Sequence, residues 1–594
     1  MTTTDKDDPF AHLHDEDYAR PFARGMAGAD SLVTLAGRTL TSLDGTWLMT
    51  LDLFDEGLRQ RWFELDETPP SQWAVPRDYE IEAGDPVPVP SCWNVLKPEW
   101  TYFEGGAWYT RWFDWQSETG AERTILSFGA ANYAALVFLN GVHGGGHRGG
   151  STPFCLEVTT HLRPGRNRLQ VYVENRRRAD RVPMHHIDWF NYGGIYREVA
   201  LVNLPKVFIR QASASLQADR ARIRFDLELS DSVDGDATVT VEGLGLASVI
   251  QIVGGKGSLT VSATPELWSC DTPRLYDVRF TFQSDHVTDR IGFRTIETHG
   301  TDILLNGQPI WLKGVCVHED DLELGKVTNE ADIRRRLGHA RELGCNFLRL
   351  SHYPHHEAVA RIADEEGFLL WAEVPVYWAI DFGNPETLAD ARNQLAELIC
   401  RDINRASVIL WGVGNENADT DARLAFMADL AQTARRLDSS RLIGAACLIN
   451  RETFTIEDRL AEHLDVIGLN EYFGWYEPNF SGLERLLANS NPDKPVIISE
   501  TGADGSPGHR GAGRVLFTED WQAEFYRQQF SRITATPYVA GLAAWLLYDF
   551  RTERRQTSFQ RGFNRKGLIG ADKSTAKLAF HALADCYRTR EPTR

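Results

Sequence analysis

The sequence predicts a multidomain β and α/β protein that joins two β-sandwiches to a (β/α)8 TIM barrel. Its 594 residues are too many for one ordinary domain. Short alternating strands with turn residues between them fill the first third of the chain, and a smaller all-β pattern follows. From Gly300 onward, apolar strand-like runs alternate with helical segments, which is typical of a parallel barrel. We therefore expect an N-terminal arm over residues 1–30 and domains over residues 31–204, 205–299 and 300–594.

The first domain has the pattern of a jelly-roll sandwich. Its strand-like runs are short, and none has helical periodicity; examples are LDGTWLMTL (43–51), AWYTRWFDW (107–115), AALVFLNGV (134–142) and RLQVYVEN (168–175). The pair Asn140-Gly141 between apolar alternations predicts a tight hairpin turn.

The second domain has the size and pattern of an immunoglobulin-like sandwich. Within about 90 residues, the period-two runs are IRFDLEL (223–229), ATVTVEG (237–243) and YDVRFTFQ (276–283). Nothing in this segment suggests catalysis, so we interpret it as a spacer.

Eight apolar runs in the last 295 residues predict the eight strands of the barrel. They cover residues 314–319, 347–352, 368–375, 408–416, 442–448, 465–472, 495–502 and 542–550. Helical patterns lie between them, for example over residues 330–344 and 421–437. In such barrels the chemistry takes place at the carboxyl ends of the strands.

Composition excludes several classes of partner. The net charge is −20, which argues against nucleic acid and anionic membranes as ligands. No apolar run is long enough to span a membrane, and the N-terminal segment lacks the apolar core of a signal peptide. The eight cysteines are scattered without a C-x-x-C pair, which predicts free thiols and a cytoplasmic location.

The predicted strand ends carry polar side chains that could do chemistry. The fourth strand, VILWGVGNEN (408–417), is an apolar run that delivers Asn415 and Glu416 at its end, and Glu500 ends the seventh strand. Strands four and seven lie nearly opposite each other in an eight-stranded ring. Two opposed carboxylates with aromatic walls suit glycosidic bond cleavage better than other common barrel chemistry. The remaining strand-end residues are His318, Glu319, Asp320, His352, Glu373, Asn470, Glu471, Tyr472 and Trp545.

Two other interpretations of these residues stay open. Glutamates at strand ends can bind metals or cap helices. The histidines His318, His352, His355 and His356 could form a metal cluster, but their spacing matches no zinc motif, and hydrogen bonding to ligands or carboxylates is the commoner role.

The ordered motifs of the chain resemble glycoside hydrolase family 2, whose members join a jelly-roll, an immunoglobulin-like domain and a barrel. The matching segments are LDGTW (43–47), VPVPSCWN (87–94), GGAWYTRWF (105–113), DWFNYGGIYREV (188–199), LKGVCVHED (312–320), RDINRASVILWGVGNE (401–416) and VIISETGADG (496–505). The resemblance implies a retaining mechanism, with Glu416 as general acid/base, Glu500 as nucleophile and Asn415 on the sugar's 2-hydroxyl. In retaining enzymes the two carboxyl groups lie about 5–5.5 Å apart. Arg405-Ala406 departs from the His-Pro usual in the family.

Within the family, the chain most resembles the β-glucuronidases. The resemblance places Tyr472 and Tyr476, from NEYFGWYEP (470–478), in the site together with Asp188 and the stacking residue Trp545. It assigns the N-x-K motif of FNRKGL, Asn564 and Lys566, to the glucuronate carboxylate, with Arg561 or Arg565 as helpers. An anionic sugar that enters a site already holding carboxylates requires a cation and an amide donor. Glu471 replaces an arginine found after the sixth-strand asparagine in some glucuronidases.

Other functions remain as alternatives. Asn-x-Lys-Gly also occurs in family members that act on neutral sugars, so β-galactosidase, β-galacturonidase or another uronidase, and a mannosidase-like activity stay open. The segment could also be a helix-entry loop with a solvated lysine. The short loop 376–386 forms no long lid, and the Gly- and Arg-rich segment 506–520 is a candidate mobile rim, which would admit oligosaccharides. A non-catalytic carbohydrate-binding protein would have lost one of the two glutamates, and neither is lost. A metal-dependent barrel enzyme would be inhibited by a chelator. We expect no cofactor, no bound metal, a carbohydrate substrate and, from the family, a dimer or tetramer.

Overall fold

The computed structural model describes residues 25–64, 79–116 and 120–589. Most of the arm predicted for residues 1–30 lies outside these ranges, although Met26 forms an isolated bridge with Gly146. The chain divides into two compact units, and each is described by itself. The first comprises residues 1–32, 39–176 and 191–206, and the second comprises residues 33–38, 177–190 and 207–594.

The first unit is a β-sandwich, as predicted. Its six-stranded sheet has the order β3 (Asp85–Val89), β2 (Gly45–Asp52), β4 (Gly106–Trp115), β10 (Gly165–Glu174), β7 (Ala134–Leu139) and β8 (Val142–Arg148). Its four-stranded sheet has the order β1 (Thr41–Ser42), β12 (Val199–Leu204), β5 (Arg123–Phe128) and β9 (Phe154–Glu157), and a short pair joins β6 (Ala131–Asn132) to β11 (Gly194–Ile195). Side chains from both sheets, among them Trp47, Val171 and Phe128, share one buried core.

The predicted turn at Asn140-Gly141 is confirmed. Leu139 of β7 pairs with Val142 of β8, so the turn consists of these two residues alone. Their φ angles are +53° and +84°, the left-handed values of the turns that match the twist of a hairpin. Asparagine and glycine adopt such angles at low cost, which explains why this pair occurs here.

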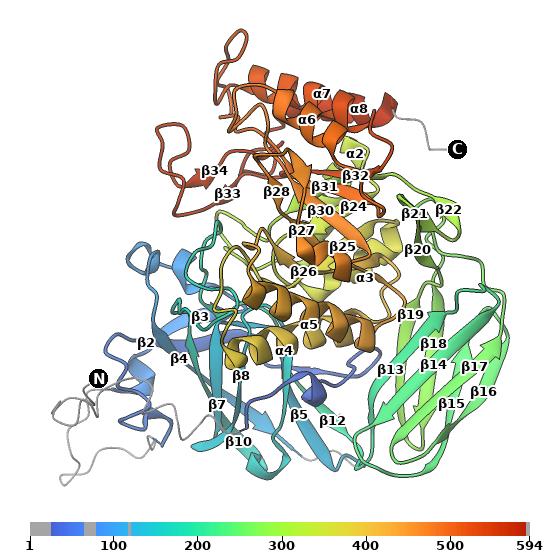
Figure 1. Cartoon of the computed structure of the whole chain (residues 1–594). Coiled ribbons are helices and arrows are strands. Elements are labelled where there is room, and N and C mark those ends of the chain that lie inside the picture. Colours follow the sequence, from blue (N-terminus) through green and yellow to red (C-terminus); the bar gives the residue numbers. More distant parts are fainter. Residues whose placement is uncertain (1–24, 65–78, 117–119, 590–594) are drawn as a thin grey trace, which may run out of the picture. The chain divides into compact units, whose positions relative to one another are not determined.

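The immunoglobulin-like sandwich, drawn in green in Figure 1, lies in the second unit. One sheet has the order β13 (Ile209–Leu216), β14 (Arg222–Leu229) and β17 (Lys256–Ser262). The other has the order β16 (Leu246–Ile252), β15 (Gly235–Val241), β18 (Tyr276–Phe282) and β19 (Asp285–Ile291). Apolar residues alternate with exposed ones along these strands and form a separate core.

The barrel is closed and all eight predicted strands are present. In order they are β23 (Leu312–Val317), β24 (Phe347–Leu350), β25 (Leu369–Glu373), β26 (Val408–Asn415), β27 (Leu442–Cys447), β30 (Val466–Asn470), β31 (Val496–Thr501) and β32 (Val539–Ala544). The last strand is shorter than predicted, because Trp545 follows it and Phe550 belongs to the separate strand β33 (Phe550–Arg551). Small antiparallel pairs or triplets flank the barrel: β20 (Ile296–His299), β21 (Asp302–Leu305) and β22 (Gln308–Pro309); β28 (Ile449–Asn450) and β29 (Thr455–Ile456); and β33 with β34 (Phe563–Asn564).

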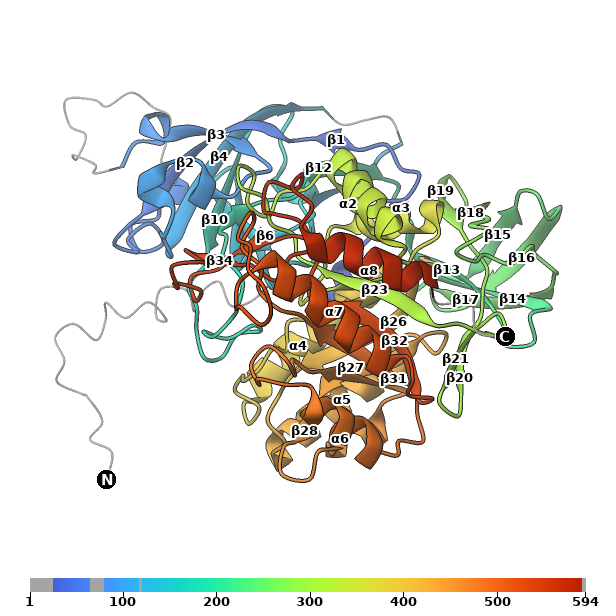
Figure 2. The ribbon, with the colours of Figure 1, turned by 90° about the horizontal axis from the view of Figure 1, so that it is seen from above.

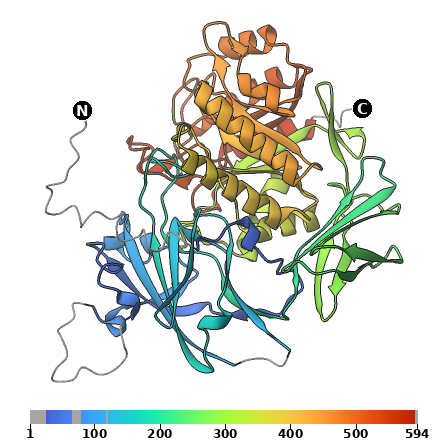
Figure 3. The ribbon, with the colours of Figure 1, turned by 60° about the horizontal axis from the view of Figure 1, so that its bottom comes forward.

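Helices cover the outside of the barrel. They are α2 (Glu330–Leu343), α3 (Glu357–Glu366), α4 (Pro385–Asp402), α5 (Asp421–Leu437), α6 (Ser481–Asn489), α7 (Glu519–Ile533) and α8 (Leu578–Thr589). Helices α7 and α8 lie side by side in Figures 1 and 2, as do α4 and α5, the ochre helices of Figure 3. Helix α2 shows how the sequence sets the ends of these helices. The Asn329 side chain caps its first turn, and Gly344 ends the helix in the left-handed conformation at φ +89°.

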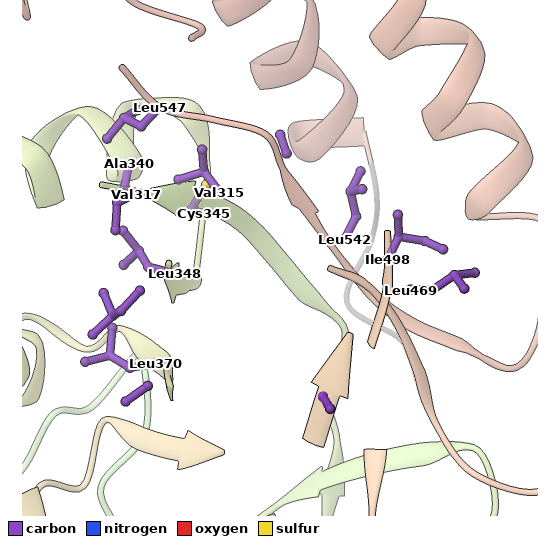
Figure 4. Close-up of a cluster of buried hydrophobic side chains, with 14 of the residues drawn as sticks. Val315, Val317, Ala340, Cys345, Leu348, Leu370, Leu469, Ile498, Leu542 and Leu547 are labelled. Atoms are coloured by element: carbon purple, nitrogen blue, oxygen red, sulfur yellow. The ribbon is translucent and has the colours of Figure 1, made fainter. Parts of the chain in front are cut away.

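Alternation along the barrel strands separates an outer core from an inner one. Leu348, Leu370 and Ile498 belong to the cluster that packs against the helices, part of which is drawn in Figure 4. Phe347 and Trp371 belong to the cluster inside the barrel. Because side chains two apart on a strand share a face, Arg349 and Glu373 lie on the inner face with Phe347 and Trp371.

Candidate active site

The two candidate carboxylates lie at the predicted end of the barrel. Glu416 directly follows β26 with a left-handed φ of +53°, at a point where the strand's register with β27 is irregular. This conformation is uncommon outside glycine and is kept where the surroundings require it. Trp378 Nε1 donates to Glu416 Oε2 at 2.8 Å, and Asn470 Nδ2 donates to Oε1 at 3.0 Å.

Glu500 lies on β31 and accepts strong hydrogen bonds. The Tyr472 hydroxyl donates to its Oε2 at 2.6 Å, and Arg349 Nη1 donates to its Oε1 at 2.9 Å. Burial raises the pKa of Glu500 to about 8, with the charge of Glu416 adding to this and Arg349 and Tyr472 opposing it. The negative charge of Glu416 therefore favours the protonated form of Glu500, which holds a proton at neutral pH.

Arg349 is the buried centre of this part of the site. Its guanidinium contacts both oxygens of Glu373 and donates to Asn415 Oδ1 at 2.7 Å, besides its bond to Glu500. Asn415 Oδ1 also accepts from Asn470 Nδ2 at 3.1 Å, whereas Asn415 Nδ2 is buried and has no partner among the described residues. A guanidinium group is planar and carries five N–H donors, so it can bind several acceptors at once.

Aromatic rings and histidines form a wall beside the carboxylates. The Trp545 ring stacks on His352 at 5.1 Å and meets His318 edge-on at 5.4 Å, and Trp189 lies within 6 Å of both histidines. His352 Nδ1 is 2.7 Å from Glu373 Oε1. Burial holds the pKa values of His318 and His352 well below the ordinary range, so both rings are neutral, and His318 Nε2 has no partner in the described part of the chain.

A second group of predicted residues surrounds Lys566. Its Nζ is 2.7 Å from Asp504 Oδ2 and 3.2 Å from the Tyr476 hydroxyl. Burial lowers the pKa of Lys566, but Asp504 and Tyr476 outweigh this and leave it raised, so the lysine is a cation. The same Nζ lies 5.8 Å from the ring of Tyr472, the residue that donates to Glu500.

Asp188 and Asn564 complete this group. The β33–β34 hairpin places Asn564, whose Nδ2 is 3.4 Å from Asp188 Oδ2, and its Oδ1 accepts from the backbone of Lys566. Arg555 forms an ion pair with Asp188 and donates to the Tyr476 hydroxyl at 3.2 Å. The Tyr476 hydroxyl therefore lies between two cations.

All twelve predicted site residues thus belong to one connected set of side chains, but several partners were not predicted. Arg349, Trp378, Trp189, Asp504 and Arg555 were missed. A cation inside the apolar run FLRL is a signal that could have revealed Arg349, and Asp504 lies within the strand-seven motif. Nothing in the sequence distinguishes Arg555 from the other arginines of its loop.

Three other residues singled out in the sequence lie apart from this group. Arg561 donates to the Ser558 carbonyl and Arg565 pairs with Asp549, so neither is the arginine found beside Tyr476. Glu471 turns away from the site: it accepts from Gln529 of helix α7 at 3.1 Å, and burial raises its pKa to about 7.

The two neighbouring histidines, His355 and His356, form hydrogen bonds with backbone groups. His355 contacts the Ser351 carbonyl and His356 caps helix α3.

Within the described ranges, no three His, Cys, Asp or Glu side chains gather in an arrangement that could hold a metal ion. No described helix is long and apolar enough to cross a membrane.

A closed parallel barrel with two interacting carboxylates and aromatic walls at the ends of its strands is the arrangement expected of a glycoside hydrolase. Three family models match the chain in succession: "Glycosyl hydrolases family 2, sugar binding domain" over residues 40–205, "Glycosyl hydrolases family 2" over residues 203–294, and "Glycosyl hydrolases family 2, TIM barrel domain" over residues 296–588. The chain belongs to this family.

Curated relatives and solved structures agree with this. A β-glucuronidase of Paenibacillus borealis is 29% identical over 582 residues, covering 90% of this chain and 94% of the relative. A solved β-glucuronidase of an uncultured Clostridium species has a TM-score of 0.82 at 28% identity, covering 94% of this chain and 99% of that one. A solved family 2 β-galacturonidase of Eisenbergiella tayi has a TM-score of 0.81 at 26% identity, covering 94% and 97%.

Proposed function

We propose that the protein is a retaining, exo-acting β-glycosidase that hydrolyses β-D-glucuronides by double displacement. The observation that carries the proposal is the link between the carboxylate pair and a buried, charged lysine. Tyr472 donates to Glu500 and lies beside Lys566, so one residue joins the site of bond cleavage to a cation suited to a sugar carboxylate.

In this proposal Glu500 is the nucleophile and Glu416 the general acid/base. Glu500 attacks the anomeric carbon while Glu416 gives its proton to the glycosidic oxygen, and water then hydrolyses the glycosyl-enzyme with Glu416 as base. Tyr472 and Arg349 orient the carboxylate of Glu500, and Trp378 and Asn470 orient that of Glu416. Asn415 Nδ2 has no partner among the described residues, which supports its role as the donor to the sugar's 2-hydroxyl.

The sugar carboxylate is proposed to bind Lys566 and Asn564. Lys566 supplies the charge and the Asn564 amide a further donor, as a carboxylate entering a negatively charged site requires. Arg555 is held by Asp188 close to the same Tyr476 hydroxyl and adds a second cation. The β-glucuronidases among the relatives support a glucuronide.

A β-galacturonide is the second candidate. The likeness to the Eisenbergiella tayi enzyme favours it, and the two sugars differ only in the configuration of one hydroxyl while sharing the carboxylate. The proposed carboxylate contacts would serve both.

The experiment measures hydrolysis of a panel of aryl β-glycosides. It compares the wild type with a variant in which the Lys566–Asp504 ion pair is replaced by neutral side chains. The wild type is expected to prefer the glucuronide over galacturonide, galactoside, glucoside and mannoside. The double variant Lys566→Met/Asp504→Asn removes both members of the ion pair, so that no buried charge is left alone. Its ratio of kcat/KM for glucuronide over glucoside should fall by about 10- to 100-fold, the effect of losing a charge-assisted hydrogen bond.

A matched control is Lys577→Met/Asp549→Asn, which removes another buried lysine–aspartate pair of the same unit. It should leave the ratio unchanged, and thermal unfolding checks that both variants fold. A preference for the galactoside, or an unchanged ratio in the Lys566 variant, would show that the carboxylate assignment is wrong. A preference for the galacturonide would select the second candidate.

We also propose the cellular location, the oligomeric state and the cofactor requirement of the protein. All eight cysteines are free thiols, which supports a cytoplasmic location. A dimer or tetramer is proposed from the family. We propose that the carboxylate pair needs no metal or cofactor.

A further inference from the structure

The loop between β33 and β34 carries two consecutive arginines with different surroundings. Arg555 contacts Asp188 and Tyr476 in the group proposed to bind the sugar. Arg554 instead lies with its guanidinium carbon 4.6 Å from the centre of the Trp378 ring. Trp378 in turn donates to Glu416 at 2.8 Å, so Arg554 is two contacts from the proposed acid/base.

The position of Trp378 relates Arg554 to the leaving group. Glu416 must come within hydrogen-bond distance of the glycosidic oxygen in order to protonate it. The group attached to that oxygen then lies beside Glu416 and the ring that holds it. The sugar itself lies toward Glu500, Tyr472 and Lys566, which are linked to one another.

Arg554 differs from its two neighbours in having no ion-pair partner among the described residues. Neighbouring Glu553 pairs with Arg177, and Arg555 pairs with Asp188. In the described part of the chain the Arg554 side chain is exposed and forms no ion pair, and only its backbone N–H is hydrogen-bonded, to Thr552. A guanidinium that rests on an indole face keeps its edge free to bind an anion.

We propose that Arg554 and Trp378 form an aglycone subsite that selects anionic leaving groups, such as a carboxylate-bearing ring or a second uronic acid. The indole holds the guanidinium in place beside the leaving group, and the guanidinium binds the carboxylate of the aglycone. The chain's net charge of −20 would otherwise repel such substrates. This inference rests on the proposed function.

The test compares 4-carboxyphenyl and 4-carbamoylphenyl β-D-glucuronide, which have similar shapes and different charges. The ratio of their kcat/KM values is measured for the wild type and Arg554→Gln, so that intrinsic leaving-group differences cancel. The variant should lower the ratio by about three- to fivefold, the range for an exposed ion pair. Arg554→Lys, which keeps the charge, should retain most of the preference, and 0.5 M salt should reduce it in the wild type.

Arg274→Gln is the matched control, because Arg274 is also exposed and lies over an aromatic ring, that of Tyr276, in the immunoglobulin-like sandwich. It should leave the ratio unchanged. Equal ratios in wild type and Arg554→Gln, or equal loss in Arg554→Lys and Arg554→Gln, would overturn the subsite. Failure of the wild type to hydrolyse either glucuronide would instead overturn the proposed function.

Discussion

The groups around Glu500 shift its pKa in opposite directions. Burial and the charge of Glu416 favour its neutral form, whereas Arg349 and the Tyr472 hydroxyl favour the carboxylate. In the proposed mechanism the proton on Glu500 must pass to Glu416 before Glu500 attacks, and the glycosidic oxygen then accepts a proton from Glu416.

This arrangement predicts the alkaline limb of the pH profile. Since burial raises the pKa of Glu500 to about 8, its carboxyl group carries a proton below that pH and loses it above. The value of kcat/KM for an aryl glucuronide should therefore fall as the pH rises through about 8. In Glu416→Gln, a dinitrophenyl glucuronide, which needs no acid, should show no such alkaline fall. A wild-type profile that stays flat from pH 6 to 10 would contradict the assignment of this proton to Glu500.

At the scale of elements, the site depends on how strand alternation presents side chains inside the barrel. Phe347 and Arg349 share the inner face of β24, and Glu373 ends β25 on the same side. Arg349 thereby joins β24 to acceptors on β25, β26 and β31. The barrel's mouth is therefore held together by one guanidinium as well as by backbone pairing.

We predict that Arg349→Met will both destabilise the protein and abolish turnover. Glu373 and Glu500 would be left buried without their cation, which costs about 3–5 kcal/mol for a buried pair. The control is Arg336→Met on α2, where the Nε and Nη1 atoms of a buried arginine have no partner among the described residues. Denaturant unfolding should show a larger decrease in the free energy of unfolding for Arg349→Met than for Arg336→Met. Equal decreases would contradict the importance of the contacts that Arg349 makes with several strands.

Much of this architecture could be predicted from the sequence. The eight barrel strands were found because each is an apolar run between helical patterns, and Glu416 and Glu500 because they interrupt such runs at their ends. Arg349, Trp378 and Arg555 were missed because their importance lies in contacts between segments far apart in the chain. No local pattern records such contacts.

At the scale of the whole molecule, the departure from the family's His-Pro pattern has a structural setting. Arg405 is buried and pairs with Asp364 of helix α3 and with Asp289 of the immunoglobulin-like sandwich. It lies before strand β26 and joins the barrel to the sandwich within the second unit. Burial raises the pKa of Asp364 to about 6, with Arg405 opposing this.

Removal of Arg405 should destabilise the protein in a pH-dependent way. In Arg405→Met, Asp364 remains buried without a cation, and its charged form becomes costlier still. Because a raised pKa in the folded state means that stability is lost as the carboxyl ionises, the loss of Tm should be larger at pH 8 than at pH 5, where Asp364 is protonated. The same Tm difference at both values would exclude Asp364 as the cause. Asp364→Asn in the same background should remove the pH dependence.

The ion pair between Lys566 and Asp504 has a consequence for turnover. A lysine without a partner would attract a uronate strongly and would hold the freed sugar acid as firmly as the glycoside. Because Lys566 already shares its charge with Asp504, its pull on any incoming carboxylate is moderated equally for substrate and product. At this end of the site, the two cations Lys566 and Arg555 are each paired with a carboxylate, so their charges are largely balanced. If Lys566 binds the sugar carboxylate as proposed, the free sugar acid should bind less tightly than it would to an unpaired lysine.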